Sequence, residues 1–433
     1  MKKALIITYY WPPAGGGGVQ RWLKFSKYMR QYGWEPVIYT HSNGEMAAVD
    51  ETLIKQVPAG IEVLKTPIWE PFHIYKFLIG KKQTDKVYSG VLVENKKKSV
   101  MQNFSLWVRG NFFIPDAKCF WIKPSIKYLT QYISENNIDA IISTGPPHTT
   151  HMIALGLKKH FSKLPWIADF RDPWTNVDYW DQLHLSTWAE GRHKTMEKKI
   201  LQHANKVVTV SWSWATDFIN LGVRKDIDVI TNGYDEADFN ADKKQLSPKF
   251  TITHIGSMNA DRNPHVFWKA LKNIIETNPN FESLLEIKLI GPLDHAITVS
   301  IEQYGLLKYV NKTDFVPHSE AIKNLCNSQV LLLPINNTPN AGGVLPGKLY
   351  EYLGAQRPII CITEGNTDSA RIMHESGAAS LCGYNDVPLM EKIILDLFAA
   401  FQAGNNTVPK NNIEKFSRKN LCGQFCDLLN SIS

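Results

Sequence analysis

The 433-residue chain is longer than one hydrophobic core usually supports, so two domains are expected. Its hydrophobic fraction of 44% and charged fraction of 21% are ordinary for a globular protein, which argues against a disordered or fibrous chain. No uninterrupted apolar run reaches about 18 residues, so a membrane-spanning helix is not expected.

The N-terminus resembles a secretory signal only superficially. The apolar run at residues 4–8 is short and leads into Tyr-Tyr-Trp-Pro-Pro at 9–13 without a small-residue cleavage site, so we predict a first β-strand. The six cysteines form no Cys-x-x-Cys pair and no regular framework. This usage favours reduced thiols in a cytoplasmic protein.

Apolar, β-branched runs alternate with helical stretches along most of the chain. The predicted strands lie at residues 3–9, 36–40, 61–65, 139–144, 165–170, 206–211, 227–231, 250–257, 285–290, 329–335 and 358–363. Most are continuously apolar, which is typical of parallel strands covered on both faces. Helices are predicted at 186–204, 263–276 and 319–328, among others. The alternation indicates doubly wound α/β sheets, with too many strands for one sheet of comfortable size.

The predicted domain boundary is a polar, proline-containing segment at 237–249, after which the strand-then-glycine pattern restarts. We therefore expect two Rossmann-like domains, over residues 1–240 and 250–415. A C-terminal helix at about 416–433 is expected to pack back on the first domain.

Positive charge is concentrated in one window. Residues 65–130 hold twelve Lys and Arg against four Asp and Glu, a net of +8, whereas the whole chain carries +7. The window is also rich in aromatic residues, among them Trp69, Phe72, Phe112 and Phe113. This combination suits an anionic membrane face, and it also suits single-stranded nucleic acid. A solvated lysine face over ordinary core aromatics is the third alternative.

The first predicted strand leads into a glycine run at 15–18 and then into a helix. Consecutive glycines let the backbone approach a ligand, and N–H groups at a helix start favour anions. The dinucleotide pattern Gly-x-Gly-x-x-Gly fails at Gln20, and no Gly-Lys-Ser/Thr follows as in a Walker loop. We predict a ligand-binding loop, with a flexible turn as the alternative.

Two further strand ends of the first half carry polar side chains. His148 follows the strand at 139–144, and Asp169 ends the strand at 165–170, just before Arg171 and Asp172. Open α/β sheets bind ligands at the carboxyl edges of their strands, so we expect His148 and Asp169 to face a ligand while Arg171 and Asp172 brace the loop. A structural histidine and a self-satisfied Asp-Arg-Asp cluster are the alternatives.

The second half holds two candidate anion sites. The Gly256 turn opens a loop with Arg262, a fixed cation suited to a departing diphosphate. The strand at 329–335 leads into a glycine-rich loop that starts the next helix, where Lys348 can reach the same anion. Glu351 lies about one turn after Lys348, where its carboxylate can accept both hydroxyls of a ribose. An exposed loop arginine and a surface Lys–Glu pair are the alternatives.

These motifs together resemble the family-4 glycosyltransferases of the GT-B architecture, in which two Rossmann-like, doubly wound α/β domains face each other across a cleft. The resemblance rests on Pro-Pro-x-x-Gly-Gly at 12–17 with Arg21, Thr-Val-Ser at 209–211, Asn-Gly-Tyr-Asp at 232–235 and His-Ile-Gly-Ser at 254–257. Its most specific part is Gly-Lys-Leu-Tyr-Glu-Tyr-Leu-Gly at 347–354, followed by Arg-Pro-Ile-Ile at 357–360. Pro-Asp at 115–116 and Asp-Phe-Arg-Asp-Pro-Trp at 169–174 are similar to a subgroup associated with bacterial surface polysaccharides.

The resemblance implies retaining, metal-independent, hexosyltransferase-like transfer from a nucleotide diphosphate sugar to a glycan or lipid-linked acceptor, with no further cofactor. Glu351 would take the ribose hydroxyls, and Arg262 and Lys348 the diphosphate. The implied donor site is completed by Gly16, Gly17, Gly256, Gly342, Gly343, Val344 and Leu345. The implied catalytic residues are Arg262, Lys348, Asp169 and His148.

Two positions depart from the family's usual pattern. Gly343 stands where a glutamate commonly touches the sugar, so the donor sugar cannot be named. Asn263 stands where the family usually has a lysine, which leaves Arg262 as the clear cation of that loop.

Two other functions stay open on the sequence: a GT-B-fold sugar-nucleotide epimerase, and a non-catalytic protein that binds nucleotide sugars or nucleic acid. We expect no nucleic-acid partner. We expect instead that the 65–130 window docks peripherally on the anionic inner face of the membrane. Its insertion residues would be the four aromatics named above, and its charges Lys81, Lys82, Lys96, Lys97 and Lys98.

Overall fold

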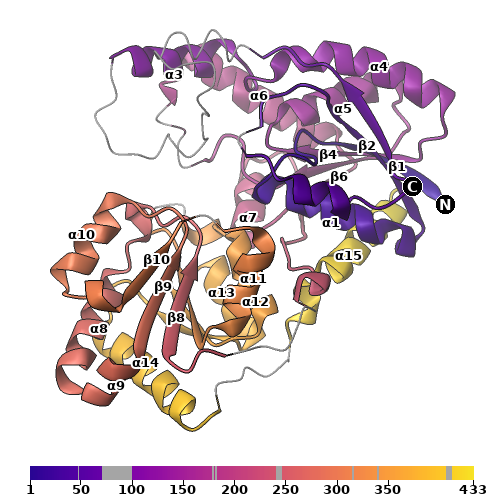
Figure 1. Cartoon of the computed structure of the whole chain (residues 1–433). Coiled ribbons are helices and arrows are strands. Elements are labelled where there is room, and N and C mark those ends of the chain that lie inside the picture. The colour runs from indigo at the N-terminus through magenta and orange to yellow at the C-terminus, as the bar shows by residue number, and fades with distance from the viewer. Residues whose placement is uncertain are drawn as a thin grey trace. The chain divides into compact units, whose positions relative to one another are not determined.

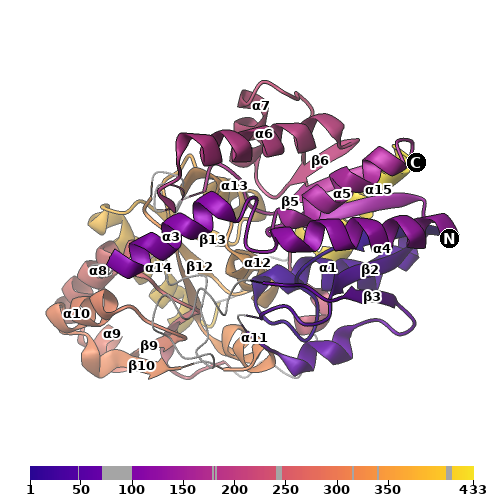
Figure 2. The same cartoon turned by 90° about the horizontal axis from the view of Figure 1, so that it is seen from above.

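In the computed structural model the chain divides into two compact units. Unit 1 comprises residues 1–231 and 421–433, and unit 2 comprises residues 232–420. The structure describes residues 1–46, 48–70, 100–177, 180, 183–239, 246–314, 316–338, 341–405 and 412–433. Each unit is a parallel sheet covered by helices (Figures 1 and 2).

Unit 1 contains a seven-stranded parallel sheet in the order β3-β2-β1-β4-β5-β6-β7. Its strands are β1 (Lys2–Ile7), β2 (Trp34–His41), β3 (Glu62–Thr66), β4 (Ala140–Gly145), β5 (Trp166–Phe170), β6 (Lys206–Thr209) and β7 (Asp228–Val229). The central strands β1, β4 and β5 are apolar on both faces because helices cover both.

The helices of unit 1 pack on the two faces of this sheet. They are α1 (Gly17–Met29), α3 (Val100–Phe112), α4 (Ile122–Glu135), α5 (Thr149–His160), α6 (Thr187–His203), α7 (Trp212–Asn220) and α15 (Arg418–Asn430). One core contains side chains of α4, α5 and α6, and the other contains side chains of α1 and α15. The C-terminal helix joins this second core through Leu421, Phe425 and Leu429. Phe425 packs edge-on against Trp22 at 5.0 Å.

A buried ion pair fastens α1 to the sheet of unit 1. Arg21 of α1 donates to both carboxylate oxygens of Asp169 at the end of β5, at 3.1 and 3.0 Å. The carboxylate also accepts from Trp22 and Thr144, while Arg21 donates to the carbonyls of Ile230 and Thr231. Asp169 is 0% exposed and Arg21 is 1% exposed. The hydrogen bonds around both charges offset the cost of their burial.

Unit 2 repeats the architecture with a six-stranded parallel sheet in the order β10-β9-β8-β11-β12-β13. Its strands are β8 (Phe250–Ile255), β9 (Leu285–Ile290), β10 (Val310–Thr313), β11 (Val330–Pro334), β12 (Ile359–Ile362) and β13 (Ala379–Cys382). Its helices are α8 (His265–Thr277), α9 (Pro279–Leu284), α10 (His295–Gln303), α11 (His318–Asn327), α12 (Gly347–Ala355), α13 (Asp368–Ser376) and α14 (Val387–Gln402).

The predicted α/β class with two doubly wound sheets is confirmed, and each predicted strand is present. The sequence analysis missed β10 and β13, the two edge strands of unit 2, because neither is a continuous apolar run. Within the described ranges, no helix is long and apolar enough to cross a membrane.

Replacing Asp169 by Asn should destabilise unit 1 strongly, because it leaves the Arg21 guanidinium buried without a counter-charge. We expect a loss of about 3–5 kcal/mol in the free energy of unfolding, measured by urea denaturation. Asp226→Asn is the control, because it breaks an exposed pair with Arg224 and should cost less than about 1 kcal/mol. Equal losses in the two variants would show that the buried pair does not stabilise the unit.

Candidate functional site

The candidate site of unit 2 begins at a glycine turn at the carboxyl end of β8. Gly256 has φ +115°, a conformation that residues with side chains rarely adopt. A Cβ placed on it would lie 1.9 Å from both Cε and Nζ of Lys348 on α12. Glycine is therefore required here for backbone conformation and for space, and its absent side chain makes room for the lysine.

Two cations converge on the carbonyl oxygen of Ser257, the next residue. Nζ of Lys348 lies 3.5 Å from this oxygen, and the Arg262 guanidinium donates to it at 3.3 Å. Arg262 also donates through Nε to the side-chain oxygen of Asn336, which follows β11. No carboxylate of the described residues lies within ion-pair distance of either cation. An anion at this edge of the sheet would thus find two fixed positive groups.

Burial changes the protonation equilibrium of Lys348. Loss of hydration and the nearby Arg262 lower the pKa of Lys348 to about 7, and Glu351 opposes the shift. Burial also lowers the pKa of Arg262. An anionic ligand would favour the charged lysine, because an opposite charge nearby stabilises the ionised form.

His254 on β8 is a further titratable group on which both cations act. Its Nδ1 is 2.9 Å from the Leu332 carbonyl, which can only accept, so Nδ1 carries the proton. Burial, with Lys348 as the next cause, lowers the pKa of His254 to about 3. The imidazole is therefore neutral at pH 7 and adds no third charge to the cluster.

Glu351 has a partner that the sequence analysis missed. Its Oε1 lies 3.4 Å from Nε2 of His318, the first residue of α11. The Glu351 side chain keeps 34% of its surface exposed. Glu351 is not ion-paired with Lys348 within the described part of unit 2, so the alternative of a surface Lys–Glu pair is not what the structure shows. His318 thus contacts the Glu351 carboxylate, and the exposed part of the side chain is accessible to a ligand.

The glycine-rich loop of unit 2 precedes α12. Ala341–Gly343 form a short 3-10 turn that also contains Gly342, and the Val344 carbonyl accepts from the Ser369 hydroxyl of α13 at 2.7 Å. Leu345 is buried. Residues 339–340 of the predicted loop lie outside the described residues. Pro346 gives α12 no side-chain cap, so no cap side chain bonds the N–H groups of the first turn, where the helix dipole has its positive end and where Lys348 lies.

In unit 1 the polar strand ends differ from the expectation. Asp169 was expected to face a ligand, but its carboxylate is fully buried against Arg21 and therefore acts as a structural anchor. Arg171 does brace a loop, because it donates to the carbonyls of Gly18, Gly145 and Pro146. This arginine thereby joins the first turn of α1 to the end of β4.

His148 and the glycine run lie at the same edge of the unit 1 sheet. His148 stacks parallel on Trp174 at 4.6 Å and is 8% exposed. Its Nδ1 has no hydrogen-bond partner in the part of the chain that the structure describes. Burial, with His151 next, lowers the pKa of His148 well below its ordinary value, so the ring is neutral at pH 7. Gly16 has φ +90° and precedes α1, which starts at Gly17, and a Cβ on either glycine would meet open space.

In unit 2, Gly256, Arg262 and Lys348 are thus brought together around Ser257. Gly16, Gly17 and His148 belong to unit 1. Sequence reasoning missed Ser257, Asn336 and His318. Within the described ranges, no group of three or more His, Cys, Asp or Glu side chains is placed to hold a metal ion.

Comparisons with known proteins found a family model that matches one segment of the chain and solved structures that share its fold. Residues 92–238 match the sequence model of Glycosyltransferase Family 4. No curated protein sequence matches the chain.

Solved structures share the fold over the whole chain. A glycosyltransferase from Rickettsia africae is 14% identical with a TM-score of 0.62, covering 100% of this chain and 98% of that one. Sucrose-phosphate synthase from Thermosynechococcus elongatus is 12% identical with a TM-score of 0.62, covering 100% and 99%. A putative UDP-N-acetylglucosamine 2-epimerase from Listeria monocytogenes is 11% identical with a TM-score of 0.56, covering 100% and 96%. At such low identities the likeness establishes the two-unit GT-B fold.

The lowered pKa of Lys348 can be measured directly. We expect a lysine 13Cε resonance that titrates near pH 7, whereas exposed lysines titrate near about 10.4. Inorganic pyrophosphate should raise this pKa, because the anion favours the charged form. The resonance should vanish in Lys348→Met.

The same shift predicts a pH-dependent stability. Between pH 7 and about 10.4 the unfolded chain keeps the Lys348 proton and the folded chain does not, so this group makes stability rise with pH. Lys348→Met should remove that rise. If every lysine titrated near about 10.4, the burial of Lys348 beside Arg262 at the Ser257 carbonyl would be contradicted.

Proposed function

We propose that this chain, whose residues 92–238 match the model of Glycosyltransferase Family 4, is a retaining glycosyltransferase that uses a nucleoside diphosphate sugar. The family match and the GT-B fold support sugar transfer in general. The donor class rests on one observation: Lys348 and Arg262 converge on the Ser257 carbonyl, and no carboxylate in the described part of the chain lies within ion-pair distance of them. Such a pair suits the diphosphate of a donor.

The two cations also suit the leaving group. When the bond between the sugar and the diphosphate breaks, negative charge develops on the phosphate oxygen. Lys348 and Arg262 would stabilise that charge, together with the positive end of α12. They provide a physical reason to propose transfer without a divalent metal.

Glu351 would orient the nucleoside. In this proposal its carboxylate accepts hydrogen bonds from the ribose hydroxyls, while His318 holds the carboxylate from the other side. Charge-assisted bonds of this kind are stronger than neutral ones. The roles of Gly16, Gly17 and the Ala341–Leu345 loop in donor binding remain part of the proposal.

The proposed chemistry is attack on the same face that the leaving group departs from. The acceptor hydroxyl forms a bond to the anomeric carbon, the bond to the diphosphate breaks, and the acceptor proton passes to a phosphate oxygen. Gly343 stands where a carboxylate could have assisted, so the departing phosphate serves as the base. The motifs at 115–116 and 169–174 favour a glycan or lipid-linked acceptor and a role in surface polysaccharide synthesis.

The epimerase alternative is less well supported. Elimination chemistry needs acids and bases near the sugar, and Asp169 was one of the two residues that the sequence offered. Its carboxylate accepts from Arg21, Trp22 and Thr144 and is 0% exposed, so it is not free for proton transfer.

We also propose that unit 1 docks on an anionic membrane face. Aromatic side chains of the 65–130 window are exposed: Trp69 by 56%, Phe104 by 50% and Phe112 by 67%. Phe112 packs edge-on against Trp107 of the same helix, and Trp69 against Phe120. Phe113 is half-buried. Phe72 and the five lysines named for this role lie outside the described residues. Exposed rings in a sequence window with a net charge of +8 suit the headgroup region of anionic lipids.

Glu351→Ala should weaken nucleoside diphosphate binding far more than it changes folding. The loss of a charge-assisted bond should cost about 1.5–3 kcal/mol of binding free energy, measured by calorimetry with UDP, GDP and ADP. Glu302→Ala, an exposed glutamate on α10, is the charge-matched control and should bind normally. Unchanged affinity in a folded Glu351→Ala variant would remove the ribose assignment.

Vesicle co-sedimentation tests the membrane proposal. Binding to phosphatidylglycerol vesicles should exceed binding to phosphatidylcholine vesicles and should fall with salt, because the Debye length shortens to about 8 Å at physiological ionic strength. Binding should also drop when Lys81, Lys82, Lys96, Lys97 and Lys98 become Gln. The control replaces five exposed lysines elsewhere in unit 1: Lys159, Lys163, Lys198, Lys199 and Lys225. If the wild-type protein ignores anionic vesicles at low salt, the window is a solvated surface.

A further inference from the structure

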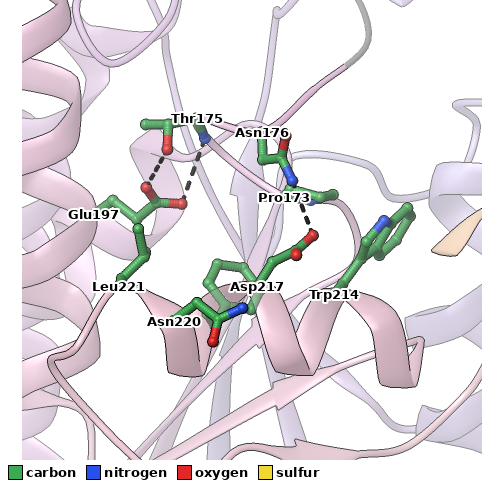
Figure 3. A pocket seen from close by; sticks show the side chains of 9 residues that line it. Pro173, Thr175, Asn176, Glu197, Trp214, Asp217, Asn220 and Leu221 are labelled. Carbon is green, nitrogen blue, oxygen red and sulfur yellow. Dashed lines mark hydrogen bonds between the residues drawn. The ribbon is translucent and has the colours of Figure 1, made fainter. Parts of the chain in front are cut away.

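Unit 1 contains a small open cavity beside the end of β5 (Figure 3). Its volume is about 200 Å³. This is below the ~300–1,000 Å³ of pockets for drug-sized ligands, so it suits a single ring rather than a nucleotide. The lining residues are Pro173, Thr175, Asn176, Glu197, Trp214, Asp217, Phe218, Asn220 and Leu221.

The cavity lies where open α/β sheets bind ligands. Pro173, Thr175 and Asn176 belong to the loop that follows β5, and α7 follows β6, the neighbouring strand. The carboxyl ends of β5 and β6 meet at the same edge of the sheet. Glu197 of α6 forms the opposite wall (Figure 3).

The polar lining is held in place by hydrogen bonds. Glu197 accepts from the Thr175 hydroxyl at 2.6 Å and from the Thr175 backbone N–H at 3.4 Å. Asp217 accepts from the Asn176 amide at 2.8 Å. Glu197 is only 2% exposed, so its contacts fix it as part of the wall. Asp217 is partly exposed, and a carboxylate offers about four acceptor positions, so it keeps acceptors for a ligand. The Asp217 carboxylate therefore suits a ligand with hydroxyl donors.

The rest of the lining supplies apolar surface. The indole of Trp214 and the ring of Phe218 come from α7, and Pro173 and Leu221 lie beside them. Ring surfaces next to a few placed polar groups are typical of small-ligand pockets. A sugar ring presents both kinds of surface, hydroxyls at its edge and C–H groups on its faces.

The charge of the lining excludes an anionic ligand. It contains Glu197 and Asp217, and no lysine or arginine is among its residues. A phosphate or carboxylate placed here would meet like charge without a counter-ion. This lining is opposite in sign to the Lys348 and Arg262 pair of unit 2, so the cavity does not suit the diphosphate of the donor.

We propose that this cavity binds one uncharged sugar ring, the acceptor sugar of the transfer reaction. The acceptor role rests on the glycosyltransferase function proposed above, whereas binding of the ring itself does not. In this assignment Asp217 accepts hydrogen bonds from the sugar hydroxyls, and Trp214 packs against the ring.

The test is binding of small neutral sugars to the full-length protein. The probes are the methyl glycosides of glucose, galactose, mannose and N-acetylglucosamine, with glucose 6-phosphate as the anionic comparison. Binding is followed by saturation-transfer NMR. At least one glycoside should bind, and glucose 6-phosphate should bind more weakly than methyl glucoside.

Two variants and a control locate the binding. Asp217→Ala and Trp214→Ala should each weaken the glycoside at least about fivefold, as expected for the loss of one hydrogen bond or one packing surface. Thr216→Ala changes an exposed residue of the same helix outside the lining and should have no effect. Titration with UDP, GDP and ADP should give wild-type affinities in all three variants.

The outcomes separate the two proposals. If no glycoside binds, if the lining variants bind like Thr216→Ala, or if glucose 6-phosphate binds more tightly, the cavity assignment is wrong even when diphosphates bind normally. If the glycoside binds and depends on Asp217 while no nucleoside diphosphate binds, the sugar site stands and the donor proposal fails.

Discussion

The candidate site of unit 2 depends on the missing side chain at Gly256. Because the lysine fills the space that a Cβ would need, Lys348 lies against the end of β8 and close to Arg262. Two positive groups are thereby confined around the Ser257 carbonyl, in a place where loss of hydration disfavours charge. No carboxylate of the described residues lies within ion-pair distance of these groups, and the nearby Glu351 offsets only part of the cost. A site of this kind is more stable when an anion occupies it, and this links the packing of one glycine to the proposed donor class.

Unit 1 uses its charges differently. Arg21 and Asp169 neutralise each other inside the unit, and their hydrogen bonds connect α1, β5 and the backbone at Ile230 and Thr231. Arg171 then ties the first turn of α1 to the end of β4. Among the described residues near this edge, the neutral His148 packs on Trp174, and the acids Glu197 and Asp217 line the cavity. The proposed diphosphate site of unit 2 and the proposed sugar cavity of unit 1 therefore differ in the sign of their charged side chains.

Much of the fold could be predicted from the sequence, because buried parallel strands contain continuous apolar runs such as 4–7 and 330–334. The edge strands β10 and β13 were missed because their outer sides are not covered, so polar residues are tolerated there. The position of residues at strand ends can be predicted from the sequence, but the direction of their side chains cannot. Asp169 was recognised as an acid at a strand end, yet its partner Arg21 lies 148 residues away and holds the carboxylate inside the unit. Ser257 contributes a backbone oxygen, His318 begins α11 and Asn336 follows β11, so no local pattern marked them.

The central claim is that a diphosphate binds between Lys348 and Arg262 beside the Gly256 turn. The most direct measurement is a crystal structure of the protein with a nucleoside diphosphate bound. Phosphate oxygens should lie within hydrogen-bond distance of Lys348 Nζ and the Arg262 guanidinium, and the ribose should lie against Glu351. A diphosphate bound elsewhere on the protein, with both cations still directed at the Ser257 carbonyl, would contradict the account.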